Sequence, residues 1–119
     1  MAIIVGITGR LAGQVVLSFN KATASRIAGQ MTKKPVSRDI TTHQRSALSE
    51  LANMIAGHAT IELSEAGFLC DITPPSLLVG TNIRVAVKEQ IKTVVIPLKL
   101  SHGNIFVNLS LMESTPGAR

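Results

Sequence analysis

Two polar residues near the middle of the sequence have the types and the spacing that a reactive site needs. Glu50 carries a carboxylate, and Asn53 carries a carboxamide three positions further on. The surrounding pattern predicts a helix, and residues three apart on a helix lie on the same face. The two groups should therefore project together from the exposed side, within reach of one small target.

The helix that carries this pair is expected to run from about Thr41 or Thr42 to Ala59. Its apolar residues gather on the far side: Leu48, Leu51, Ala52, Ile55 and Ala59. Small residues flank the pair and should contact a partner, because they let another protein surface come close: Ser46, Ser49, Ala56 and Gly57. A solvated helix face also carries Glu and Asn without any function, so geometry alone leaves that alternative open.

The remaining elements predict a sheet that positions this helix. Alternating apolar residues and turn glycines indicate strands at 2–8, 14–19, 92–100 and 104–111, with extended backbone at the prolines of 71–75. Asn20 is expected to cap a first helix that ends near Met31, before Lys33-Lys34-Pro35. Adjacent strand pairs around two helices predict an α+β fold, a largely antiparallel β-sheet covered by two α-helices in a single domain, residues 1–119.

Composition and charge narrow the function classes. The 119 residues are 45% hydrophobic and 16% charged, which excludes disorder. We expect a cytoplasmic protein, because Cys70 is the lone cysteine and no segment predicts a signal peptide or a membrane span. Residues 1–45 hold seven basic residues against one acidic residue, which suits an acidic partner surface. Nucleic acid is not expected as a partner, since Trp and Tyr are absent and no reading motif occurs.

Other reactive patterns are missing from the sequence. The glycines at 6–13 are not followed by the Lys-Ser/Thr of a phosphate loop, so they are interpreted as turn residues. His43, His58 and His102 are scattered without the spacing of metal ligands. We therefore expect no metal or cofactor of the chain's own.

Three sequence blocks together resemble the CheX-type chemotaxis phosphatases of the CheC/CheX/FliY superfamily, over essentially the whole chain. Residues 46–57, with Glu50 followed three positions later by Asn53, resemble the signature helix of this family. Gly6-Ile-Thr-Gly9 with Gly13 resembles its first hairpin, and Asp71-Ile-Thr-Pro-Pro75 with Gly80 resembles its proline-turn strand. Two departures are visible: the sequence starts at the hairpin, without the usual preceding helix and strand, and Ser49 stands where the family often has glycine.

The resemblance implies a substrate, a partner and a role for each residue. The substrate would be the aspartyl phosphate of a CheY-like response regulator. Asn53 would orient a water molecule for in-line attack, and Glu50 would contact the active-site lysine of the receiver. Mg²⁺ would be held by the receiver itself. The alternative is a catalytically silent binding or dimerisation module of the same superfamily, resembling the flagellar-switch proteins.

The resemblance also implies a homodimer, because CheX-like proteins are typically dimers. Without the usual N-terminal helix and strand, we expect Ile3, Val5 and Ile7 to begin the chain with little shielding. An uncovered strand edge pairs readily with another chain. The faces that carry Glu50 and Asn53 should stay outside the contact, since each must reach a receiver.

Overall fold

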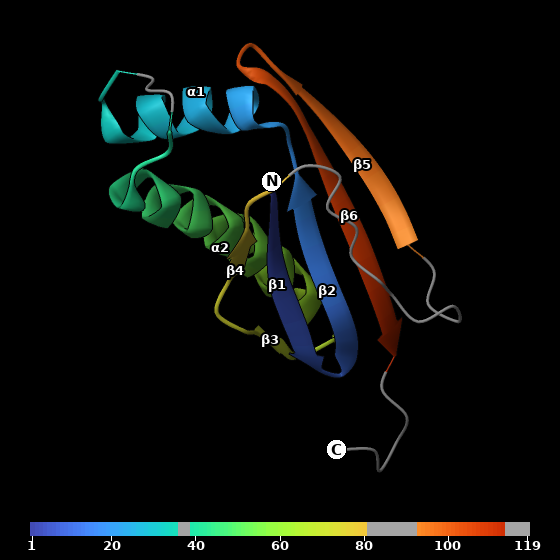
Figure 1. Ribbon diagram of the computed structural model, residues 1–119. Coiled ribbons are helices and arrows are strands. Elements are labelled where there is room, and N and C mark those ends of the chain that lie inside the picture. The colour runs from blue at the N-terminus through green and yellow to red at the C-terminus, as the bar shows by residue number, and fades with distance from the viewer. Residues whose placement is uncertain (36–38, 81–92, 114–119) are drawn as a thin grey trace.

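The computed structural model describes residues 1–35, 39–80 and 93–113. In these parts the chain forms one six-stranded sheet with two helices beside it (Figure 1). The elements in chain order are β1 (Ala2–Gly9), β2 (Leu11–Ser18), α1 (Lys21–Thr32), α2 (Thr42–Glu65), β3 (Cys70–Ile72), β4 (Ser76–Leu78), β5 (Thr93–Leu100) and β6 (Gly103–Glu113). Every strand pairing is antiparallel, and the predicted α+β fold is confirmed.

The sheet has the order β3-β1-β2-β6-β5, and β4 also pairs with β1. Alternate residues of β1 and β2 enter the core, which fits the period of two along a strand. Ile3, Val5 and Ile7 are at most 2% exposed. The expectation that these residues lack shielding is therefore wrong. The physical reason is that β3 and β4 return beside β1, so the first strand lies inside the sheet and not at its edge.

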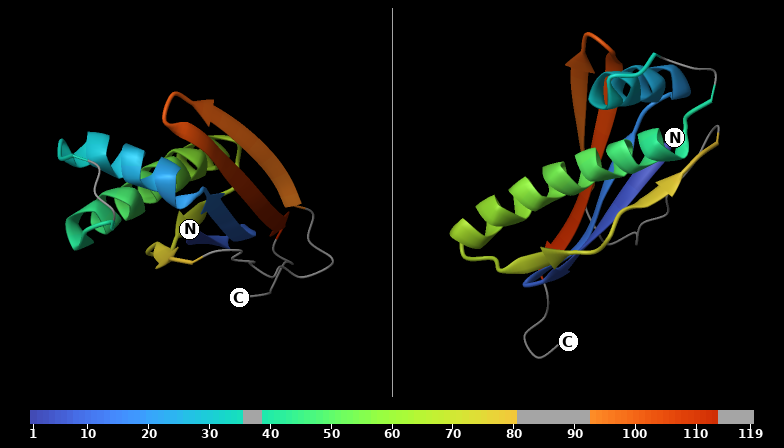
Figure 2. Two further views of the ribbon diagram at one scale, coloured as in Figure 1. Left: turned by 45° about the horizontal axis from the view of Figure 1, so that its top comes forward. Right: turned by 90° about the vertical axis from the view of Figure 1, so that its left-hand side faces the viewer.

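Both helices lie on the same side of the sheet, and α2 crosses that side obliquely (Figure 2). Asn20 caps α1 as predicted, because its side-chain oxygen accepts a hydrogen bond of 2.8 Å from the Thr23 amide. Thr41 and Gln44 form a capping box at the start of α2, in which each side chain accepts a hydrogen bond from the other residue's backbone amide at 3.1 Å. These caps fix where each helix begins.

The buried side of α2 is a row of residues spaced by four: Gln44, Leu48, Ala52, Ala56 and Thr60. We call these five residues the core row. An i+4 row is inclined to the helix axis, so the buried side rotates slowly around the helix along its length. The row packs where α2 meets α1, β1 and β3.

The second helix is longer than the sequence pattern indicates, since it ends at Glu65 and not near Ala59. Gly67 terminates it with a left-handed φ of 100°. The Gly67 amide donates to the Ser64 carbonyl at 3.0 Å, and the Phe68 amide donates to the Leu63 carbonyl at 2.8 Å. This double pattern is the glycine-dependent helix ending, and it supplies a stop signal eight residues after Ala59.

The predicted hairpin is confirmed by the pairing of β5 with β6, and its turn consists of Ser101 and His102. This hairpin forms the other end of the sheet. Lys92, the first residue of the expected strand, lies outside the described residues. All residues of β5 are exposed, and in Figure 1 this strand lies farthest from the helices. Within the described ranges, neither helix combines the length and apolarity that crossing a membrane requires.

The capping box leads to a prediction about the stability of α2. Replacing Thr41 by alanine removes the acceptor for the Gln44 amide and should lower the free energy of unfolding by about 1 kcal/mol. Thr41→Ser keeps the oxygen and should stay within a few tenths of wild type. Urea denaturation followed by circular dichroism measures both, and an unchanged midpoint for Thr41→Ala would contradict the role of the cap.

Candidate functional site

A groove with a volume of about 830 Å³ separates α2 from the β3–β4 segment. Its α2 wall consists of Thr42, Arg45, Ser46, Ser49, Glu50 and Asn53. Its opposite wall consists of Ile72, Thr73, Pro74, Pro75 and Leu77. The predicted acid–amide pair therefore lies at a concave surface, which suits the reception of a small target better than a flat helix face.

Glu50 and Asn53 have different exposures within this groove. Glu50 is exposed, whereas Asn53 is half-buried. Across the described residues, neither side chain has a hydrogen-bond or ion-pair partner in the protein. The carboxylate and the amide are thus both available to a molecule that enters the groove.

The four small residues predicted to contact a partner do not all reach the surface. Ser46 is exposed, and Ser49 is half-buried in the groove wall. Gly57 is also half-buried and lies one turn beyond Asn53. Ala56 is 0% exposed, so its assignment to the partner surface is wrong. It belongs to the core row, whose rotation around the helix turns this position inward.

The opposite wall of the groove is held by β1. The Gly6 amide donates to Thr73 Oγ1 at 2.9 Å, and the Thr73 amide donates to the Gly6 carbonyl at 2.9 Å. A Cβ atom on Gly6 would lie 2.9 Å from Thr73 Oγ1, so glycine permits this close approach. The adjacent Pro74 and Pro75 form a rigid stretch facing α2. The prolines of 71–75 indicated extended backbone, but nothing in the sequence predicted that this segment forms a groove wall.

Arg45 is a second groove residue that the sequence analysis missed. It is exposed and supplies a cation at the same α2 wall that carries the Glu50 carboxylate. The α2 wall of the groove therefore carries both a positive and a negative group. Arg45 precedes Glu50 by five positions, a spacing that does not place two residues on the same side of a helix, so the helical pattern did not group them.

Metal and thiol chemistry find no support at this site. In residues 1–35, 39–80 and 93–113, no group of three or more His, Cys, Asp or Glu side chains could hold a metal ion. Burial raises the pKa of the Cys70 thiol above its ordinary value, and the neighbouring Asp71 raises it further. A thiol with a raised pKa stays protonated near neutral pH and is a poor nucleophile.

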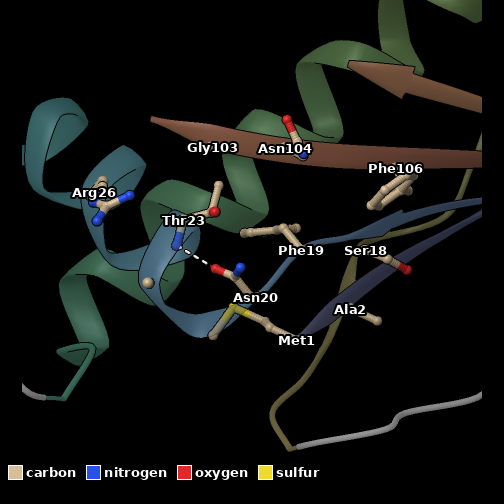
Figure 3. A pocket seen from close by; sticks show the side chains of 11 residues that line it. Met1, Ala2, Ser18, Phe19, Asn20, Thr23, Arg26, Gly103, Asn104 and Phe106 are labelled. Carbon is tan, nitrogen blue, oxygen red and sulfur yellow. Dashed lines mark hydrogen bonds between the residues drawn. The ribbon is translucent and has the colours of Figure 1, made fainter. Parts of the chain in front are cut away.

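A second cavity, with a volume of about 510 Å³, lies where the start of α1 meets β1 and β6 (Figure 3). Its polar residues have structural partners. Asn20 caps α1 through the Thr23 amide, as the dashed line in Figure 3 shows. Arg26 Nη1 donates to the His102 carbonyl at 3.2 Å and so attaches α1 to the β5–β6 turn. None of the predicted site residues lines this cavity.

Comparisons with known sequences point to one family. The family model described as chemotaxis phosphatase CheX matches residues 1–99. A curated protein from Thermotoga maritima, the CheY-P phosphatase CheX, is 32% identical over 82 residues. The match covers 69% of this chain and 53% of the relative, so the chain spans about half the length of that protein.

Solved structures show the same fold. A chemotaxis protein CheX from Desulfovibrio desulfuricans is 30% identical, with a TM-score of 0.84 over 93% of this chain and 73% of its own. A CheX–CheY–BeF₃–Mg²⁺ complex from Borrelia burgdorferi provides a neighbour that is 27% identical, with a TM-score of 0.83 over 94% of this chain and 75% of the matched one. The helix with its acid–amide pair, the fold and the family match lead to one conclusion: this chain belongs to the CheX family of chemotaxis phosphatases.

Proposed function

We propose that this chain removes the phosphoryl group from the aspartyl phosphate of a CheY-like response regulator. The observation that carries the proposal is the groove in which the Glu50 carboxylate and the Asn53 amide lie without internal partners. A purely structural member of the superfamily would have no need of this pair. The Thermotoga maritima relative is a CheY-P phosphatase, which supports the same substrate class.

Asn53 orients the attacking water in this mechanism. Its amide both donates and accepts hydrogen bonds, so a single side chain can fix the position and the lone pair of one water molecule. Phosphoryl transfer depends mainly on such positioning and on charge stabilisation, because the transition state is loose. The half-buried setting of Asn53 restricts its side chain before the receiver arrives. The water then lies in line with the bond between phosphorus and the aspartyl oxygen.

Glu50 docks the helix by pairing with a lysine of the receiver. An anion that enters an acidic phosphorylation pocket is repelled unless a cation of the partner meets it. The exposed Glu50 carboxylate has no competing cation bound within the described residues. Arg45, at the same groove wall, is available to acidic groups at the rim of that pocket. Together the two charges favour receivers over other phosphoproteins.

Mg²⁺ belongs to the receiver in this scheme. The structural neighbour from Borrelia burgdorferi is a CheX bound to CheY with BeF₃ and Mg²⁺. When bound, the ion neutralises charge on the phosphoryl oxygens. We also place the reaction in the cytoplasm, because the lone Cys70 is free and fits a reducing compartment.

Loss of Asn53 should remove most of the catalysis. The wild-type chain is expected to accelerate the decay of ³²P-labelled CheY-like receivers, including CheY of Thermotoga maritima. Asn53→Ala should lower this rate about 10²-fold or more, the usual cost of losing a positioned catalytic group. Asn104→Ala makes the same chemical change at an exposed position on β6 and should keep the wild-type rate. No acceleration by the wild type with any receiver would refute the proposed function.

Loss of the Glu50 charge should act on binding. Glu50→Gln keeps the shape of the side chain but leaves the receiver's lysine without its partner, so the Kd should rise at least about tenfold. Glu65→Gln removes a carboxylate from the exposed end of the same helix and serves as the control. Calorimetric titration with a BeF₃-activated receiver measures both. Equal affinities for Glu50→Gln and wild type would exclude the docking role.

We propose further that the chain is a homodimer whose contact includes β5. Val94, Ile96 and Leu98 lie opposite residues of β6 that belong to the core or pack on it, and so point to the side of the sheet that the helices cover. Leu100 follows in the same alternation, which makes four apolar residues. All four are exposed, and we call them the β5 face. An apolar face on an edge strand is a favourable surface for a second copy. This face replaces the N-terminal strand as the expected contact.

The dimer has a direct test in solution. Light scattering at micromolar protein should give twice the 12.6 kDa mass of one chain. Ile96→Asp places a charge in the middle of the β5 face and should shift the mass to that of the monomer. Ser76→Asp, at an exposed position of β4, is the control. A wild-type chain that runs as a monomer at this concentration would refute the proposal.

A further inference from the structure

The exposed side of α2 continues well beyond the acid–amide pair. Met54 follows Glu50 by one turn, and Ile61 follows Asn53 by two turns. Both are large apolar residues, and their exposed fractions are 46% and 58%. Met54 and Ile61 both lie on the solvent side of α2, away from the core row. The reactive face and an exposed apolar face therefore form one continuous surface.

Gly57 lies between Met54 and Ile61 on this surface, three residues after the first and four before the second. A Cβ atom added to Gly57 would meet nothing within 4 Å, so packing does not require glycine here. Its φ also lies outside the left-handed region that favours glycine. Glycine in a helix interior lowers stability relative to alanine. The fold thus gains nothing from Gly57, which leaves a shallow gap between two apolar side chains.

We propose that Met54, Gly57 and Ile61 form a docking surface on which the receiver rests while its phosphorylated site meets Glu50 and Asn53. This proposal rests on the proposed function. Met54 and Ile61 supply apolar area, and the missing side chain at Gly57 admits a side chain or backbone segment of the receiver between them. His58 and Glu62, both exposed on the same helix, form a polar rim. An apolar centre with a polar rim is the usual anatomy of a protein interface.

The position of this docking surface favours the receiver as its occupant over a second copy of the chain. The surface is continuous with the acid–amide pair, so a second copy that covered it would obstruct the groove. The β5 face already offers the second copy an apolar contact of its own. The docking surface also touches parts of the receiver that do not react. Contacts of that kind stabilise the ground state and the transition state alike, and they lower KM without changing kcat.

Substitutions at the docking surface should therefore separate binding from chemistry. Met54→Gln and Ile61→Gln should each raise KM about tenfold and leave kcat at saturating receiver unchanged. Met112→Gln is the matched control, because Met112 lies on β6 with a similar exposed fraction of 45%. The Kd is measured with the receiver that the wild type dephosphorylates fastest, loaded with BeF₃ and Mg²⁺.

Gly57→Ala is a more specific test, because it should increase stability and weaken receiver binding. The urea midpoint should rise, since alanine favours the helix, whereas KM should rise as the gap fills. Gly57→Leu should raise KM further, and its urea midpoint confirms that it folds. If the wild type hydrolyses the phosphoryl group and the KM and Kd of all four variants stay within twofold of wild type, the docking surface is refuted. The proposed function would then still stand. A wild type that neither binds nor dephosphorylates any receiver would overturn the proposed function as well.

Discussion

The contact between the core row of α2 and the elements beneath it determines how the rest of the site is presented. Three of its five residues are small or short, Ala52, Ala56 and Thr60, so the helix axis lies close to its neighbours. A row with this inclination leaves one rotation of the helix that buries all five residues. That rotation turns Asn53 partly into the groove and Glu50 outward. Burial of a few methyl groups thus orients side chains that never touch the core.

Different residues of the site hold the structure together and are available for chemistry. Within the described residues, the helix caps and the contact of Thr73 with Gly6 are made by hydrogen bonds inside the protein, whereas Glu50 and Asn53 have no partner there. Asn53 is only half-buried, so its amide stays open to solvent and to an entering molecule. In the proposed function, a receiver supplies partners to both side chains.

The sequence was sufficient for features that depend on local periodicity. The two hairpins, the cap at Asn20 and the shared face of Glu50 and Asn53 follow from strand alternation, capping chemistry and helical spacing. The assignment of Ala56 failed because a fixed stripe was assumed where the buried row rotates. The prediction of where α2 ends was wrong, because Gly67 ends the helix through its left-handed backbone, which the sequence does not show.

The pairing of strands that are far apart in the sequence could not be predicted from local periodicity. The short strands β3 and β4 bury few residues and show little alternation, so nothing in them indicated that they return beside β1. The burial of Ile3 and the position of Pro74 and Pro75 in the groove wall both depend on the pairing of β3 and β4 with β1. The same limit applies to Arg45, because the groove that it shares with Glu50 depends on the opposite wall. The family resemblance supplied the chemistry, and the structure supplied its surroundings.

The attachment of Thr73 to Gly6 has a mechanical consequence. One wall of the groove is tied to β1 by the two hydrogen bonds of Thr73 and by the antiparallel pairing of β3 and β4, whereas the helical wall packs on apolar residues. Hydrogen bonds have a defined direction, whereas apolar contacts are not directional. The two walls are therefore attached to the sheet by different kinds of interaction. A change in the packing under α2 would alter the width of the groove without breaking the pairing of β3 and β4 with β1.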